Sequence, residues 1–190
     1  MDPLGLFYFL GFIVPISIAG FCDWRRNIVP NAITLPLMLA GMVYQTIYGG
    51  LKGLQEAFLG GFAFFFFGCL LYQLGGIGGG DVKLMIAIGC WLGVGKAAVI
   101  VLAAAIMGIV WGLCKYARMG ILRERLQAFL GALYLRLVYG TKPGWSWPRL
   151  PGDVNAPAPR EAVPFGTCLA VAATLLIIFV EVGNHAQIFF

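Results

Sequence analysis

Apolar residues occur in six long runs along the chain, and short polar or glycine-rich stretches separate them. The runs cover residues 4–21, 32–48, 53–74, 82–94, 97–114 and 163–182. A helix that crosses a bilayer needs about 20 apolar residues, and most of these runs approach that length. The pattern predicts an all-α fold, a polytopic membrane helix bundle with about six transmembrane helices. We expect residues 1–190 to form a single membrane-embedded domain.

The fourth run differs from the others in its length and in what precedes it. It spans only about 13 residues, which is short for the hydrocarbon core of a bilayer. It follows the glycine-rich stretch Gly75-Gly76-Ile77-Gly78-Gly79-Gly80. We expect this helix either to begin inside the bundle or to join the fifth helix through a tight turn at Gly93-Val94-Gly95.

The composition excludes a soluble globular enzyme. Hydrophobic residues make up 61% of the chain and charged residues 11%, and the mean hydropathy is +0.89. These values also exclude a disordered chain. Five cysteines without a CxxC pair indicate neither a disulfide framework nor metal-ligand spacing, so no metal and no cofactor is expected. Met1-Asp2-Pro3 lacks the basic region of a signal peptide, so the first helix is expected to be retained.

Basic residues are concentrated on one side of the predicted bundle. Short cytoplasmic loops accumulate Lys and Arg, and the loops after the first, third and fifth helices hold 11 of the 13 basic residues. Only Lys52 and Lys96 lie opposite. We therefore place these three loops in the cytoplasm and both termini outside, in a multi-pass protein of the cytoplasmic (inner) membrane. The net charge of +5 follows from this asymmetry and requires no nucleic-acid partner.

The longest predicted cytoplasmic segment, residues 115–160, divides into two parts. Leucine and phenylalanine recur at helical spacing over residues 122–137 with charged residues between them, which predicts an amphipathic helix on the membrane surface. Residues 141–160 hold five prolines and two tryptophans, which favour an irregular loop near the headgroups. The segment either only connects helices and shields apolar surface, or it docks a substrate.

Asp23 and Asp81 stand apart from the other acidic residues, because both lie at the predicted cytoplasmic boundary, each at the membrane end of its own helix. An acidic residue at the centre of a membrane helix costs about 2.5–3.5 kcal/mol, so each one needs a reason to be there. Two close carboxyls cannot both ionise cheaply. The charged one can deprotonate a water while the protonated one polarises a carbonyl. Acting together, the two carboxyls can hydrolyse a peptide bond without a metal or a covalent intermediate.

Simpler explanations exist for the same residues. Asp81 could cap the fourth helix, since Asp is favoured at helix N-termini. Asp23 could be an interfacial charge balanced by Arg25 or Arg26. The glycines that precede Asp81, in contrast, favour chemistry, because residues without Cβ let an extended substrate come close to the acid.

Two other polar residues have simple structural explanations. Lys83 is most simply a positive-inside anchor. His185, the only histidine, is expected in a polar C-terminal tail on the face opposite both carboxyls.

Three motifs of the chain go beyond such general patterns. The first is Asp23-Trp24-Arg25-Arg26-Asn27-Ile28-Val29-Pro30-Asn31, and the second is Gly78-Gly79-Gly80-Asp81-Val82-Lys83-Leu84-Met85. Val163-Pro164-Phe165-Gly166 is the third. Together they resemble the two aspartate motifs and the start of the last helix of the type IV prepilin peptidases, which are GxGD aspartyl membrane proteases. The resemblance covers residues 4–114 and the last apolar run.

The resemblance implies an aspartyl endopeptidase that removes the basic leader from type IV prepilin-like precursors at the cytoplasmic membrane face. Bifunctional members of the family carry paired CxxC motifs in an additional cytoplasmic part and also methylate the new pilin terminus. The sequence has no CxxC pair and no such additional part. We therefore expect a peptidase without N-methyltransferase activity, like the short peptidases of tight-adherence pili or archaeal flagellins. The residues implied are the catalytic Asp23 and Asp81, a substrate-approach loop of Gly78, Gly79 and Gly80, and the supporting residues Lys83, Pro30 and Asn31.

Two other classes of function remain open. Paired acids and glycine-interrupted helices also mark small transporters, although the chain shows no inverted repeat and both acids map to one surface. A non-catalytic assembly factor for a pilus or secretion machine would leave both aspartates as anchors. The sequence does not identify the precursor, the leader-recognition residues, the oligomeric state or the aspartate that holds the proton.

Overall fold

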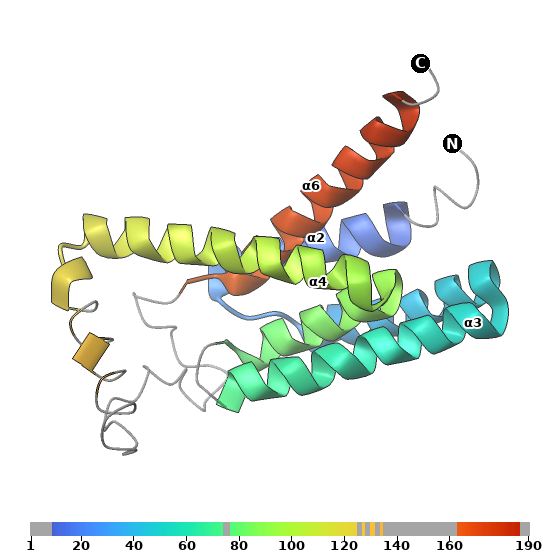
Figure 1. Cartoon of the computed structure of the whole chain (residues 1–190), viewed down its shortest axis with the longest axis horizontal. Coiled ribbons are helices and arrows are strands. Elements are labelled where there is room, and N and C mark those ends of the chain that lie inside the picture. Colours follow the sequence, from blue (N-terminus) through green and yellow to red (C-terminus); the bar gives the residue numbers. More distant parts are fainter. Residues whose placement is uncertain are drawn as a thin grey trace.

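The computed structural model describes residues 9–73, 77–124, 127, 130, 131, 134 and 163–186, and every element assigned among them is a helix. The all-α prediction is therefore confirmed for this part of the chain. The elements are η1 (Phe9–Ile13), α2 (Val14–Arg26), α3 (Asn31–Gln73), α4 (Gly79–Arg118) and α6 (Phe165–Ala186). Figure 1 shows α3 and α4 lying along one another, while α6 leaves the bundle at an angle.

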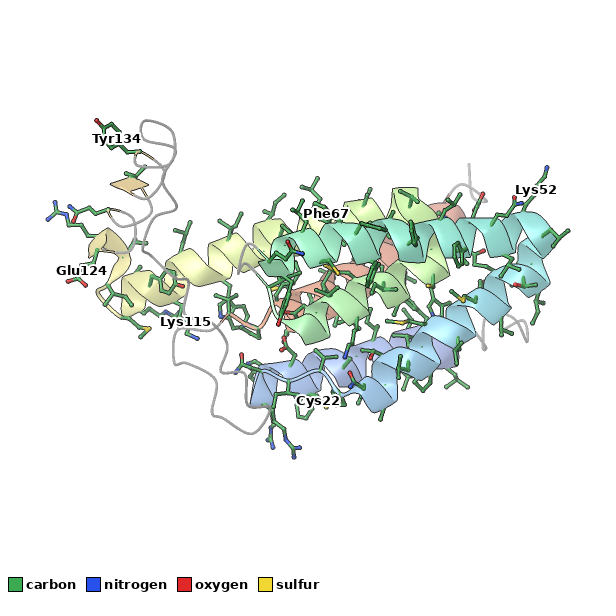
Figure 2. The ribbon with its side chains drawn as sticks, turned by 90° about the horizontal axis from the view of Figure 1, so that it is seen from below. Cys22, Lys52, Phe67, Lys115, Glu124 and Tyr134 are labelled. Carbon is green, nitrogen blue, oxygen red and sulfur yellow. The ribbon has the colours of Figure 1, made fainter. Side chains whose placement is uncertain are left out.

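The two longest helices are each a pair of helical arms joined at a glycine. Gly50 in α3 has φ 57° and ψ −139°, and Gly93 in α4 has φ 70° and ψ 179°. Only glycine adopts such positive φ values at little steric cost. The chain turns back at both points, and Figure 2 shows the turn of α3 beside Lys52. The predicted turn at Gly93 is confirmed, and the four arms correspond to the second to fifth apolar runs.

The surface of the long helices is suited to a bilayer. Both α3 and α4 are long and apolar enough to cross a membrane, and only 28% of the most apolar window of each is buried. Large side chains such as Leu51, Phe66 and Leu102 are exposed along them. A soluble helix with this composition would bury its apolar face. The structure thus identifies two helices of membrane-spanning character, and the six predicted crossings stay a prediction.

The second arm of α3 packs against the first arm of α4 through residues without bulk. A Cβ added to Gly60 would collide with the carbonyl of Gly89, and the Cβ position of Gly61 is 2.7 Å from Cys90 Sγ. The Cβ position of Gly68 is likewise 2.7 Å from Val82 Cγ1, one residue after Asp81. Helices in membranes associate closely where such small residues meet. This contact sets the position of the first turn of α4.

Trp91 joins the first arm of α3 to α4. Its side chain is 1% exposed, and Nε1 donates a hydrogen bond of 2.7 Å to the carbonyl of Leu37. The Cβ position of Gly41 is 2.5 Å from the indole Cδ1, so only glycine leaves room for the ring there. Gln45 Nε2 donates to the Trp91 carbonyl at 2.8 Å, close to the break at Gly93. The indole therefore has both an apolar pocket and a hydrogen-bond acceptor.

Two predictions about the C-terminal half need comment. Of the predicted amphipathic helix, residues 122–124, 127, 130, 131 and 134 are described and are helical, whereas the rest of it and the proline-rich loop 141–160 lie outside the described residues. His185, expected in a polar C-terminal tail on the face opposite both carboxyls, lies in the last turn of α6, which continues to Ala186, and its place on that face stays a prediction. The apolar run that ends at Val182 is thus followed by another turn of helix.

We expect Gly60→Ala to lower the thermal unfolding midpoint of the purified protein in detergent. The added methyl group must displace the backbone of α4, and such overpacking costs about 1–3 kcal/mol. Gly49→Ala is the matched control on the same helix, because its Cβ position has no atom within 4 Å. Equal midpoints for the two variants would contradict the close contact between α3 and α4.

Candidate active site

Asp23 lies near the C-terminal end of α2 and is only 4% exposed. The helix closes at Asn27, which has φ 50°, and the Asn27 N–H donates to the Asp23 carbonyl at 2.7 Å. Asn is one of the few residues other than glycine that adopt this left-handed conformation readily. The chain then turns, and the Pro30 carbonyl accepts hydrogen bonds from the first turn of α3. The carboxyl of Asp23 is thus carried inward by the last turn of α2.

Asp81 is the third residue of α4, after Gly78 at the N-cap, and is 9% exposed. Its Oδ2 accepts a hydrogen bond of 3.1 Å from the Gly78 N–H. This is the contact that an acidic residue at the third helical position makes in a capping box. The alternative role of Asp81 as a cap is therefore supported, and it coexists with a buried carboxyl.

The two carboxyls converge on Gly166, in the first turn of α6. The Cβ position of Gly166 is 3.0 Å from Asp23 Oδ2 and 3.0 Å from Asp81 Oδ1, so these oxygens cannot be further apart than twice that distance. The structure thus brings together the two aspartates that the sequence singled out, and places a third helix against them.

Thr167 supplies further contacts to Asp23. Its N–H donates to Asp23 Oδ2 at 2.9 Å, and its Oγ1 lies 3.3 Å from the same oxygen. Sequence reasoning missed both Gly166 and Thr167 as site residues. The motif Val163-Pro164-Phe165-Gly166 was the signal that could have found them, because it marks the start of the helix that reaches the carboxyls.

Arg25 and Arg26 do not account for the burial of Asp23. Both side chains are exposed, and the guanidinium of Arg25 lies over the ring of Phe21, 5.3 Å from its centroid. The described hydrogen-bond partners of the Asp23 carboxyl are the N–H and the hydroxyl of Thr167. The interfacial charge-balance explanation for Asp23 therefore finds no support in these contacts.

The three supporting residues lie where the second and fourth predicted helices begin. Lys83 Nζ donates to Asn31 Oδ1 at 2.7 Å, which ties the first turn of α4 to the first turn of α3. The Pro30 carbonyl accepts from the N–H of Ile33 at 3.1 Å and from that of Thr34 at 3.3 Å. Lys83 is therefore more than a surface charge, since it links two of the helix ends around the site.

The glycines before Asp81 differ in their local contacts. Gly78 donates its N–H to Asp81, while Gly79 is exposed. The Cβ position of Gly80 is 3.0 Å from Val29 Cβ, so the absence of a side chain there allows the loop between α2 and α3 to pack closely. These contacts do not test whether the glycines also admit a substrate, which stays a prediction.

An apolar groove of about 310 Å³ runs between α2 and α6 beside this site. Its lining includes Gly20, Trp24, Thr167 and Val171. Thr167 therefore contacts both the groove and Asp23. Within the described residues, no group of three or more His, Cys, Asp or Glu side chains is placed so that it could hold a metal ion.

A comparison with known protein families identifies the family of the chain. The sequence model described as the type IV leader peptidase family matches residues 9–113, which include Asp23 and Asp81. The chain belongs to the type IV leader peptidase family. The matched residues end at 113, before α6 begins at Phe165. Gly166 and Thr167 therefore lie outside the part of the chain that the family model matches.

Three individual proteins with similar sequences are named as prepilin leader peptidases. The chain is 32% identical over 114 residues to a prepilin leader peptidase/N-methyltransferase of Neisseria gonorrhoeae, covering 56% of this chain and 38% of the relative. It is 33% identical over 111 residues to the protein of that name from Escherichia coli K12, covering 55% and 48%. A protein of that name from Aeromonas salmonicida is 25% identical over 166 residues, covering 84% and 44%. The chain therefore spans less than half the length of these relatives, and no solved structure matches it.

Gly166→Ala should lower the thermal unfolding midpoint, because the new methyl group would stand 3.0 Å from oxygens of both carboxyls. Displacing a packed helix in this way costs about 1–3 kcal/mol. Gly108→Ala is the matched control, since its Cβ position is 3.5 Å from Phe165 Cδ2, an ordinary contact on the same turn of α6. A Gly166→Ala midpoint as high as that of Gly108→Ala would contradict the convergence of the three helices.

Proposed function

We propose that this protein is an aspartic endopeptidase that removes the basic leader peptide from type IV prepilin-like precursors. The observation that carries the proposal is the convergence of Asp23 and Asp81, from two different helices, on the first turn of α6. Membership of the type IV leader peptidase family supports it. The names of the relatives, prepilin leader peptidase/N-methyltransferase, indicate the substrate class.

The proposed reaction uses a water between the two carboxyls. One carboxylate takes a proton from the water, whose oxygen attacks the scissile carbonyl, and the protonated carboxyl of the other aspartate donates to the carbonyl oxygen. When the tetrahedral intermediate collapses, the proton taken from the water passes to the leaving amine, and a hydroxyl of the intermediate returns a proton to the other aspartate as the new carboxyl group forms. The two aspartates then return to their starting states. Gly78, Gly79 and Gly80 would admit the precursor backbone beside Asp81, while Lys83, Pro30 and Asn31 hold the surrounding helix ends.

The site would lie at the cytoplasmic face of the inner membrane. Cys22, which precedes Asp23, and Lys115 lie toward one end of the bundle, and Lys52 lies at the other (Figure 2). The last turn of α2 holds Arg25 and Arg26 and the last turn of α4 holds Lys115 and Arg118, so these basic residues belong with the former end. Loops rich in such residues are retained in the cytoplasm. A leader that carries basic residues would stay on that same side.

The proposal is confined to peptide-bond cleavage. The names of the relatives also include an N-methyltransferase, but the chain covers less than half of each of them. The sequence has no CxxC pair, the feature that accompanies methylation in the family it resembles. Methylation is therefore not proposed for this chain.

Asp23→Asn and Asp81→Asn should each abolish cleavage of a prepilin-like precursor from the same genome. The amide keeps the shape of the carboxyl but cannot exchange a proton, and such groups contribute about 10²–10⁴-fold to the rate. Cleavage is followed by gel shift after co-expression, and N-terminal sequencing of the product identifies the bond that is cut. Glu56→Gln is the matched control, because this exposed carboxyl lies beside Gly93 and is expected to be dispensable.

The outcomes separate the competing classes of function. Wild-type activity in either asparagine variant would contradict the carboxyl pair. Failure of the wild type to cut several such precursors would favour a non-catalytic assembly factor. A transporter would instead lose ion or solute transport in the asparagine variants and yield no peptide product.

The proposed orientation predicts which residues are accessible from outside the cell. In a cysteine-free variant that still cuts the precursor, a cysteine at Lys52 should react with a membrane-impermeant maleimide in intact cells. A cysteine at Arg118 should react only after the membrane is permeabilised, because the basic end faces the cytoplasm. The reverse labelling pattern would place both aspartates on the outer face and would contradict the site of leader removal.

A further inference from the structure

The first turn of α6 contacts Asp23 in a way that the proposed reaction has not used. Thr167 presents two donors, its N–H at 2.9 Å and its hydroxyl at 3.3 Å, to a single oxygen of the carboxyl, Oδ2. The same hydroxyl lies 3.0 Å from the carbonyl oxygen of Gly20, which is in the turn of α2 that precedes Asp23. Thr167 thus contacts both the carboxyl and the backbone of the helix that carries it.

The backbone contact has a structural reason. The first N–H groups of a helix have no partner within the helix, and α6 begins at Phe165. The Asp23 carboxyl accepts from the N–H of Thr167, and so caps α6 from a neighbouring helix. The positive end of the helix dipole also favours a negative charge at this point. A capping role accounts for the N–H but not for the hydroxyl.

The hydroxyl of Thr167 behaves differently from that of Thr174 on the same helix. Thr174 Oγ1 donates to the Ala170 carbonyl at 2.8 Å, the bond to the preceding turn that a helical threonine usually makes. Thr167 Oγ1 instead reaches across to α2. The two helices are tightly packed there, since the Cβ position of Gly20 is 2.5 Å from Ala170 Cβ. The separation of α2 and α6 beside Thr167 and Asp23 is therefore set by close packing.

We propose that Thr167 is a positioning residue that holds Asp23 in one orientation throughout the reaction, an inference that rests on the proposed peptidase function. A hydroxyl carries one proton and can also accept one hydrogen bond or two. Toward ionised Asp23 it donates to Oδ2. When Oδ2 carries a proton, the hydroxyl accepts from it and donates to the Gly20 carbonyl. Asp23 can then gain and lose a proton without turning, and Thr167 itself neither gains nor loses one.

The test compares variants that differ only in the hydroxyl. Thr167→Val keeps the shape and the backbone N–H, so α6 remains capped while the hydroxyl is lost. Thr167→Ser keeps the hydroxyl, and Thr174→Val removes a hydroxyl from the same helix and the same groove without touching Asp23. The rate of cleavage of a purified prepilin-like precursor is measured in detergent over a range of precursor concentrations, which gives kcat and KM separately.

Thr167→Val should lower kcat about 10- to 100-fold, the effect of losing a hydrogen bond to a charged group, with KM within about twofold of the wild-type value. Thr167→Ser should restore most of kcat, and Thr174→Val should match the wild type. The thermal unfolding midpoint of each variant shows whether α6 has stayed in place.

Three results would overturn the proposal. The first is a wild-type kcat in Thr167→Val. The second is a loss in Thr167→Ser as large as that in Thr167→Val, which would assign the effect to packing. The third is an equal loss in Thr174→Val. If the wild type cuts no precursor, the proposed function fails and the role of Thr167 fails with it, whereas an active wild type with an active Thr167→Val variant refutes the role of Thr167 alone.

Discussion

Two carboxyl groups buried among apolar helices need hydrogen-bond donors in place of water, and this need fixes how the helix ends meet. An unpaired buried charge is among the most costly features that a protein can hold. The donors here include backbone N–H groups at helix starts: Gly78 at the start of α4 and Thr167 at the start of α6. The groups that satisfy the carboxyls are thus the same groups that the helices leave unpaired.

The position of Asp81 depends on packing away from the carboxyls. The glycines of α3 allow α4 to approach until backbone meets backbone at Gly60 and Gly89, and Gly68 lies against Val82, the neighbour of Asp81. Trp91 fixes the other face of α4 to Leu37 through its indole N–H. The first arm of α4 is therefore held on two sides. A carboxyl in its first turn has little freedom to move away from α6.

The sequence predicted the parts of this structure that depend on local patterns. The apolar runs anticipated both arms of α3 and of α4, and Gly93 identified the turn between two of them. Asp23 and Asp81 were found because acids are rare in apolar chains. Gly166 and Thr167 were missed because their contact with Asp23 joins residues far apart in the chain. The spacing of apolar residues predicts helices, but it does not indicate which helix ends lie next to each other. For the same reason the sequence did not show that Gly80 packs on Val29.

The origin of the donors to Asp23 also bears on the order in which the site is completed. A chain is synthesised from its N-terminus, so α2 and α4, with both aspartates, are made before α6. More than 40 residues separate the end of α4 at Arg118 from the start of α6 at Phe165. During that interval Asp23 lacks the N–H and the hydroxyl of Thr167. The last helix of the described chain therefore brings the final hydrogen-bond donors to Asp23, and a newly made chain holds both acids without those donors until α6 has been synthesised.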